Sequence, residues 1–265
     1  MAARIRLTGN GAGATLADSR RLEELSLNAS GAFQSLVYDG WLVGYRKGPT
    51  KRLRCVNPFY PSSLPLEKKV EYCTQFYAAA NLPAIFRLLP FSHPSSLDTY
   101  LERAGWGSFE RTLVLRAALG HVPAPVLPDV QVDIVPPPDW VQTVAPLLDV
   151  TADALPQMIE RAKSYPLRHA GAIIRCDGTV IACGMLKLED EHAGLFAVHT
   201  ASAMRGTGLG RAVVAALLAE AVRQGARTAY LQVTADNAAA LALYRHFGFA
   251  PAYDYWYRAR PGEQH

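Results

Sequence analysis

The chain has 265 residues, 50% of them hydrophobic and 19% charged, which is an ordinary globular composition and enough length for two domains. Its formal net charge is +4, with no run of lysines and arginines interleaved with aromatic residues, so a nucleic-acid partner is not expected. No apolar stretch approaches the roughly 18 residues of a membrane span, and the four cysteines show neither CxxC pairing nor a histidine at metal-ligand spacing. We therefore expect a cytoplasmic protein with reduced thiols, without a metal or a membrane partner.

The first half of the chain predicts an alternation of helices and strands. Residues 1–19 lack an apolar signal core and are expected to form a flexible tail. Hydrophobic periodicity then predicts helices at 20–27, 66–80 and 96–104, and strands at 35–45, 51–57, 84–89 and 108–116. Six prolines between residues 120 and 140 indicate an extended linker at 119–130. The expected domains are therefore 20–118 and 131–260.

The second half repeats this order of elements. Helices are expected at 140–148, 155–163 and 209–224, and strands at 171–176, 180–188, 194–200 and 228–234, with a hairpin turn at Asp177-Gly178. A last helix is expected between an N-cap at Asp236 or Asn237 and Gly248 at its C-terminal end.

Three landmarks keep one register between the halves. Glu67 and Arg211 lie 144 residues apart, as do Phe86 and Tyr230, and Gly105 and Gly248 lie 143 apart. Such a period indicates a duplicated domain rather than a solenoid.

A glycine-rich segment, Met204 to Arg211, lies between strand 194–200 and helix 209–224. Its glycines at 206, 208 and 210 permit positive φ angles and close backbone approach, and the following helix points its positive end at the same place. The segment therefore predicts a phosphate-binding loop, to which Arg205 and Arg211 add positive charge. It lacks the Gly-Lys-Ser/Thr of a Walker loop and the GxGxxG spacing and ribose-binding acid of a dinucleotide fold.

Two ordered motifs carry a family resemblance. The first is Arg205-x-x-Gly208-x-Gly210, and the second is Asn237-x-x-Ala240-x-x-Leu243-Tyr244-x-x-x-Gly248-Phe249. Together they resemble the GNAT acetyltransferase superfamily over about residues 131–260. The resemblance implies an α/β (α+β) fold with two GNAT-like domains. Each has a mixed, mostly antiparallel central sheet with a splayed parallel pair and flanking helices.

The first of these domains is expected to be degenerate. In place of the glycine loop it has Tyr60-Pro61-Ser62-Ser63-Leu64-Pro65, which has no glycine and whose two prolines lack N–H groups. Tyr244 in the second half aligns with Leu101 at an offset of 143 residues and with Tyr100 at an offset of 144. We expect this half to shape the acceptor pocket or to brace the fold.

The resemblance also implies roles for individual residues. It implies acetyl-CoA as acyl donor, bound by Val198, His199, Thr200, Arg205, Gly206, Thr207, Gly208, Leu209, Gly210, Arg211, Asn237 and Tyr244. The backbone N–H of Val198 would stabilise the oxyanion, and Tyr244 would protonate the departing thiolate. The base is placed at Glu191, with Glu189, Asp190, His199 and water as alternatives.

The expected activity is transfer of an acetyl group to a primary amine of a small molecule, by direct attack through a tetrahedral intermediate. One alternative within the enzyme class is acetylation of a protein N-terminus or lysine. A different class is an acyl-CoA-binding sensor without turnover, which the presence of Tyr244 argues against, and a minor alternative is a dinucleotide oxidoreductase. The sequence leaves monomer and homodimer open.

Overall fold

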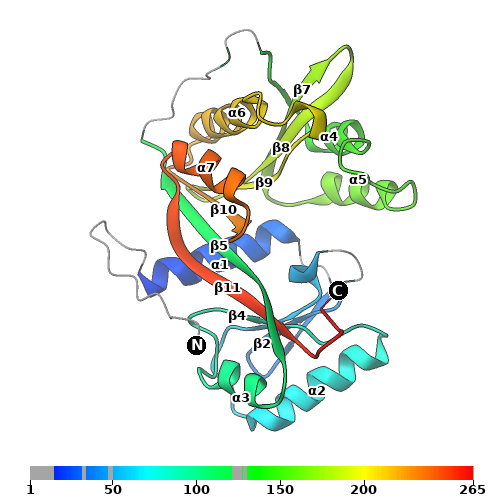
Figure 1. Ribbon diagram of the computed structural model, residues 1–265, viewed down its shortest axis with the longest axis vertical. Helices are drawn as coiled ribbons and strands as arrows, with labels where there is room; N and C mark the ends of the chain where they lie inside the picture. Colours follow the sequence, from blue (N-terminus) through cyan, green and yellow to red (C-terminus); the bar gives the residue numbers. More distant parts are fainter. Residues whose placement is uncertain (1–14, 32–33, 47–49, 121–126, 128–129, 265) are drawn as a thin grey trace. The chain divides into compact units, whose positions relative to one another are not determined.

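The computed structural model describes residues 15–31, 34–46, 50–120, 127 and 130–264 (Figure 1). The chain divides into two compact units, unit 1 with residues 1–114 and 251–265 and unit 2 with residues 115–250. The last strand therefore groups with unit 1, whereas the sequence places residues 131–260 in one domain. Most of the expected linker at 119–130 lies outside the described residues.

Unit 1 contains α1 (Leu16–Ser30), α2 (Leu66–Ala79), α3 (Leu97–Arg103) and the short 3-10 helix η1 (Lys51–Leu53). Its strands are β1 (Ser35–Tyr38), β2 (Trp41–Gly44), β3 (Val56–Pro58), β4 (Phe86–Leu88), β11 (Ala250–Ala259) and β5 (Gly107–Ala118), the last four residues of which belong to unit 2. They lie in the order β1-β2-β3-β4-β11-β5. Strands β3 and β4 are parallel, and the pairs β1/β2, β2/β3 and β4/β11 are antiparallel.

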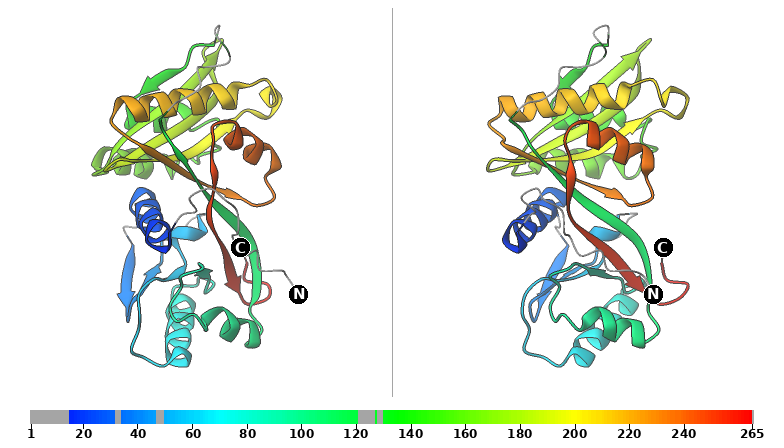
Figure 2. Two further views of the ribbon diagram at one scale, coloured as in Figure 1. Left: turned by 90° about the vertical axis from the view of Figure 1, so that its left-hand side faces the viewer. Right: turned by 60° about the vertical axis from the view of Figure 1, so that its left-hand side comes forward.

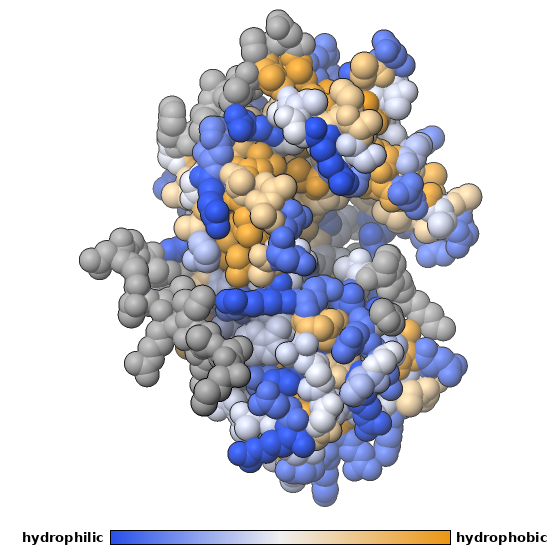
Figure 3. Space-filling view, viewed as in Figure 1, coloured by the Kyte–Doolittle hydropathy of each residue, from blue (hydrophilic) through white to orange (hydrophobic). Residues whose placement is uncertain are grey.

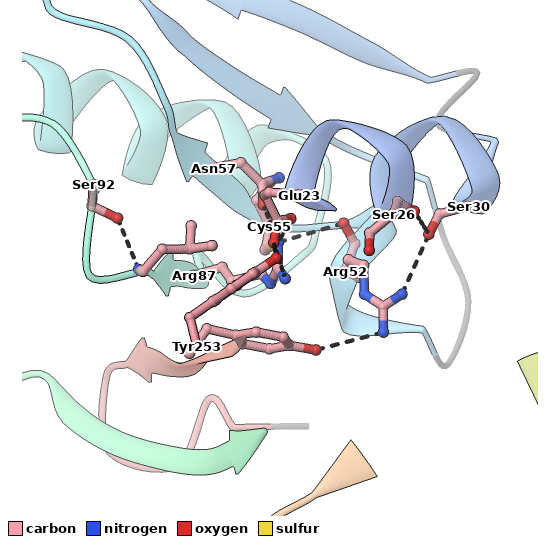
Figure 4. Close-up of polar contacts among 11 residues, drawn as sticks. Glu23, Ser26, Ser30, Arg52, Cys55, Asn57, Arg87, Ser92 and Tyr253 are labelled. Atoms are coloured by element: carbon pink, nitrogen blue, oxygen red, sulfur yellow. Dashed lines mark hydrogen bonds and ion pairs between the residues drawn. The ribbon is translucent and has the colours of Figure 1, made fainter. Parts of the chain in front are cut away.

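The two faces of this sheet are covered in different ways. An apolar core lies under α2 and α3, where the ring of Phe86 contacts those of Trp41 and Trp106 edge-on. Helix α1 packs on the other face through a polar network. We define this network as Glu23, Ser30, Arg52, Cys55, Asn57, Arg87, Tyr253 and Tyr255, most of which Figure 4 shows. Its central residues Glu23 and Arg87 are 1% and 0% exposed, so α1 is held by buried charges as well as by apolar contacts.

Three expectations for unit 1 need correction. Residues 15–19 do not belong to the flexible tail expected at 1–19, because α1 starts at Leu16 with a capping box in which Thr15 and Asp18 exchange hydrogen bonds; residues 1–14 lie outside the described residues. The single strand expected at 35–45 is a hairpin, because Asp39 and Gly40 both take positive φ angles and turn the chain. The strand expected at 51–57 begins only at Val56, after η1.

Unit 2 contains α4 (Pro137–Val144), α5 (Leu155–Ser164), α6 (Leu209–Arg223), α7 (Ala238–His246) and the 3-10 helix η2 (Ser202–Met204). Its strands are β6 (Asp133–Val135), β7 (Arg168–Cys176), β8 (Thr179–Glu189), β9 (His192–Thr200) and β10 (Thr228–Thr234), in the order β10-β9-β8-β7-β6. Neighbours are antiparallel except β9 and β10, which are parallel. The expected mixed sheet with a parallel pair and flanking helices is confirmed.

Helices cover both faces of the unit 2 sheet (Figure 2). A Cβ added at Gly184 would meet Leu217 and Val213 of α6, at 2.8 Å each, so this glycine lets α6 approach one face closely. On the other face a Cβ at Gly171 would collide with Trp140 of α4, whose indole N–H donates to the carbonyl of Ala172 at 3.1 Å. Helix α4 begins at Pro137, three residues earlier than expected, because proline is favoured in the first turn of a helix.

None of the helices in the described ranges is long and apolar enough to cross a membrane. All four cysteines are free, and Cys176 alone among them is exposed.

Candidate active site

Strands β9 and β10 pair only over their first residues. The registered pairs are His192 with Thr228, Ala193 with Ala229 and Gly194 with Tyr230. Beyond them, the described residues of β9 have no registered partner on β10, and residues 196–200 are at least partly exposed. We call residues 195–200 the open edge. Such an edge can accept an extended chain as an additional strand, because its backbone groups are not used by a neighbour.

The open edge contains a β-bulge. Pairing with β8 shifts between Cys183 with His199 and Met185 with Phe196, so Ala197 and Val198 together face a single residue of β8. Ala197 has a φ of 49°, a conformation that costs a non-glycine residue about 1–3 kcal/mol. A bulge removes a residue from the hydrogen-bonded ladder and re-aims its backbone. The bulge thus lies where an oxyanion donor at Val198 is expected.

The glycine loop connects β9 to α6. Gly206 and Gly208 have φ angles of 81° and 90°, as a turn of converging N–H groups requires. The N–H groups of Arg211 and Ala212 donate to the carbonyl of Gly208, at 2.9 and 3.1 Å, and start the helix. Within the part of the chain that the structure describes, the backbone N–H groups from Gly206 to Gly210 donate to no protein acceptor.

Gly210 differs from Gly206 and Gly208, because neither its backbone conformation nor its surroundings require a glycine. It lies in the first turn of α6 without a positive φ, and an added Cβ would make only ordinary contacts, 3.5 Å from Oγ1 of Thr200 and 3.6 Å from Cδ2 of Leu243. Arg205 is exposed, and Arg211 is partly exposed. The loop therefore presents donors and positive charge at a helix N-terminus, which is an arrangement that binds phosphate groups.

Helix α7 carries the second motif. Oδ1 of Asn237 accepts from the N–H of Ala240 at 3.0 Å, so this side chain caps the helix and leaves its NH₂ group for a ligand. Tyr244 is 8% exposed, and its ring packs edge-on against Phe249. Burial raises the pKa of Tyr244 to about 12, so its phenol is protonated at neutral pH. Apolar side chains gather around α7 on the face shown in Figure 3.

The candidate bases lie in two different places. Glu189 is the last residue of β8, and Asp190 and Glu191 form the turn before β9; Glu191 is paired with Arg227 at 3.1 Å, and its side chain is 61% exposed. Val198 is seven residue steps beyond Glu191 along the strand, which is about 23 Å. The structure therefore does not bring Glu191 to the open edge. Glu191 precedes the first residue of β9, and the open edge is at the other end of this strand. His199 lies on the open edge and is partly exposed.

The matched family agrees with this geometry. Residues 142–249 match the family model for the acetyltransferase (GNAT) family. This segment belongs to the GNAT family. The match includes the bulge, the glycine loop and α7, and it ends before β11. The family match therefore agrees, over residues 142–249, with the resemblance that the motifs predicted.

Individual proteins extend the likeness beyond this segment. The chain is 24% identical over 92% of its length to the uncharacterised N-acetyltransferase YobR of Bacillus subtilis strain 168, of which it covers 99%. It is 36% identical over 76 residues to the ribosomal protein bS18-alanine N-acetyltransferase of Escherichia coli K12, which is 29% of this chain and 51% of that protein. A solved GCN5-related N-acetyltransferase from Kribbella flavida shares the fold, with a TM-score of 0.67 at 18% identity, over 94% of this chain and 97% of that one.

Sequence reasoning missed a polar group on the α4/α5 face of the same sheet. Lys187 on β8 is flanked in sequence by Leu186 and Leu188, which are buried against the opposite face. Its own side chain points to the face under α4 and α5, where Met185 packs two residues earlier. A lysine on the inward side of a strand between buried leucines is the signal that could have identified it.

Proposed function

We propose that this protein transfers the acetyl group of acetyl-CoA to the primary amine of a small molecule. The observation that carries the proposal is that the open edge leads directly into the N–H groups of Gly206 to Gly210, which have no acceptor among the described residues. A pyrophosphate fits converging N–H donors at a helix N-terminus, and the two amides of a pantetheine arm fit an unpaired strand edge. One continuous segment, residues 195–210, supplies both.

The bulge and α7 supply the chemistry. The amine attacks the thioester carbonyl carbon, and the carbonyl oxygen becomes an oxyanion. The nitrogen then loses a proton to water, and the carbon–sulfur bond breaks to release the neutral amide and a thiolate. In this proposal the N–H of Val198, re-aimed by the bulge, donates to the oxyanion. The phenol of Tyr244 then donates its proton to the thiolate, and the NH₂ group of Asn237 donates to the bound CoA.

Removal of the Tyr244 hydroxyl tests its assigned role. A Tyr244→Phe protein is expected to keep its affinity for acetyl-CoA and to lose about a hundredfold in kcat, measured as thiol release. Tyr60→Phe, at a tyrosine that is 57% exposed, is the control and should match wild type. Because the acid must be protonated and burial raises the pKa of Tyr244 to about 12, kcat should show no decline up to pH 10. Undiminished turnover by Tyr244→Phe would remove this residue from the mechanism.

Unit 1 supports a duplicated fold without a second acyl-CoA site. Strands β1 to β4, with α2 before β4, have the same antiparallel, antiparallel, parallel pairing as β7 to β10 with α6. In the loop before α2, however, the carboxylate of Asp39 accepts from the N–H groups of Ser63 and Leu64, at 3.0 and 2.9 Å. These bonds hold the pKa of Asp39 well below its usual range. The carboxylate of Asp39 thus occupies the backbone N–H groups that would otherwise face a phosphate, which supports a degenerate GNAT-like unit.

The test has two parts. Calorimetric titration should show binding of acetyl-CoA and not of NAD; absence of acetyl-CoA binding would overturn the proposal. Thiol release is then measured with butylamine and with a peptide that has an N-terminal alanine. A preference for the peptide would favour the second candidate, protein N-terminal acetylation, which is suggested by the name of the Escherichia coli relative.

A further inference from the structure

A row of side chains crosses the unit 2 sheet where β9 and β10 begin to separate. By register, His169 on β7 is opposite Lys187 on β8, Lys187 is opposite Gly194 on β9, and Gly194 pairs with Tyr230 on β10. Residues that lie opposite one another across a sheet point to the same face. Gly194 adds no side chain to the row, and a Cβ there would come within 2.5 Å of the Phe196 ring and 2.7 Å of the Tyr230 ring.

The row lies on the face from which an acceptor can reach the open edge. Helix α6 packs tightly against the other face, where Val213 and Leu217 contact Gly184. Phe196 and Met185 belong to the α4/α5 face together with the row. An amine directed at a thioester on the open edge therefore approaches along the face that carries Lys187.

The ammonium group of Lys187 lies over aromatic rings. Its Nζ is 4.0 Å from the ring centroid of Tyr165 and 5.8 Å from that of Phe196, whose ring extends over Gly194 opposite Lys187. These rings form a surface that attracts a cation. The ammonium group of a cationic acceptor on the same surface would be repelled by the ammonium group of Lys187. This repulsion favours the state in which only one of the two groups is protonated.

Burial lowers the pKa of Lys187 to about 8. Its titratable neighbours on this face are Tyr165, His169, Glu189, His192 and Tyr230. Both ring nitrogens of His169 lie within 3.2 Å of backbone carbonyls, and burial raises the pKa of Tyr165. Lys187 is partly exposed and thus reachable by water. With its pKa at about 8, the neutral form of Lys187 is well populated slightly above neutral pH.

We propose that Lys187 accepts, through water, the proton that the acceptor's ammonium group loses, after the Tyr165 and Phe196 rings have held that group. This inference rests on the proposed acetyl transfer. The neutral Nζ takes one proton and becomes an ammonium, and the acceptor becomes the free amine that attacks the thioester. Lys187 returns its proton to solvent before the next turnover. The acceptor class is a primary alkylammonium ion, held by cation–π contact.

The experiment compares Lys187→Met, Lys187→Arg and the control Lys163→Met. Lys163 is exposed on α5 and pairs with Glu160 at 2.7 Å. With phenethylamine as acceptor, wild-type kcat should fall as the pH drops below about 8, because Lys187 becomes protonated. Both Lys187 variants should lose about a hundredfold in kcat together with this pH dependence, since arginine keeps the charge but does not deprotonate. Lys163→Met should match wild type.

A second readout does not need turnover. The chain has only six lysines, so NMR of lysine labelled at Cε resolves each titration, and the signal lost in Lys187→Met identifies Lys187. A midpoint near 8 is expected, against about 10.4 for an unperturbed lysine. A midpoint above 10, rescue by arginine, or a Lys187→Met profile like that of wild type would overturn the proposal. Failure of wild type to bind acetyl-CoA would instead overturn the proposed function.

Discussion

A Gly208→Val protein is expected to bind acetyl-CoA about a hundredfold more weakly than wild type. Gly208 has a φ of 90°, which β-branched residues avoid, so valine forces the backbone at Gly208 to turn. That rotation re-aims the N–H groups of Leu209 and Gly210, which we assign to the pyrophosphate. Two hydrogen bonds to a charged group contribute about 1.5 kcal/mol or more each, and 3 kcal/mol is about a hundredfold in affinity. Calorimetric titration measures the change directly.

Gly225→Val is the matched control. Gly225 has a φ of 91°, and a Cβ there would meet nothing within 4 Å, so valine imposes the same backbone strain. It lies at the other end of α6, about 25 Å from Gly208 along the helix. Affinity for acetyl-CoA should therefore be unchanged in Gly225→Val. Equal weakening in both variants would mean that strain in α6, and not the direction of the N–H groups, reduces binding.

The glycine loop and α7 could be predicted because their determinants are local. Positive φ at Gly206 and Gly208 and the cap at Asn237 depend on residues within one turn of the chain. The bulge and the open edge depend on which strands pair and where the pairing stops, which a single strand's sequence does not encode. The distance of Glu191 from the open edge could not be predicted for the same reason, since an acidic turn next to a strand does not show which end of the strand carries the site.

The buried charges beneath α1 show a second limit of prediction from the sequence. Arg87 lies between two buried apolar residues, Phe86 and Leu88, and such alternation ordinarily places the charge in solvent. Here α1 covers that face, and Glu23 of α1, which is 64 residues away in the sequence, pairs with Arg87. Local patterns predict which side of a strand differs from the other, but not whether a later or earlier element buries that side.

A Glu23→Gln protein is expected to lose about 3–5 kcal/mol of the free energy of unfolding of unit 1, because it leaves the guanidinium of Arg87 buried without its counter-ion. Both Nη atoms of Arg87 donate to the Glu23 carboxylate, and the hydroxyl of Tyr253 donates to it at 2.6 Å. Glutamine fills the same space, so the loss reports the charge. Three of the four tryptophans, Trp41, Trp106 and Trp256, lie in unit 1, so fluorescence during urea unfolding follows this unit.

The neighbouring residue supplies the control. Glu24 is also on α1, but its side chain is 49% exposed and pairs with Arg21 at 3.4 Å, so Glu24→Gln should change stability by no more than about 0.5 kcal/mol. The double change Glu23→Gln with Arg87→Met removes the unpaired cation and should recover a large part of the loss. If the double variant is as unstable as the sum of its single changes, the cost lies in lost packing and hydrogen bonds of α1 rather than in an uncompensated charge.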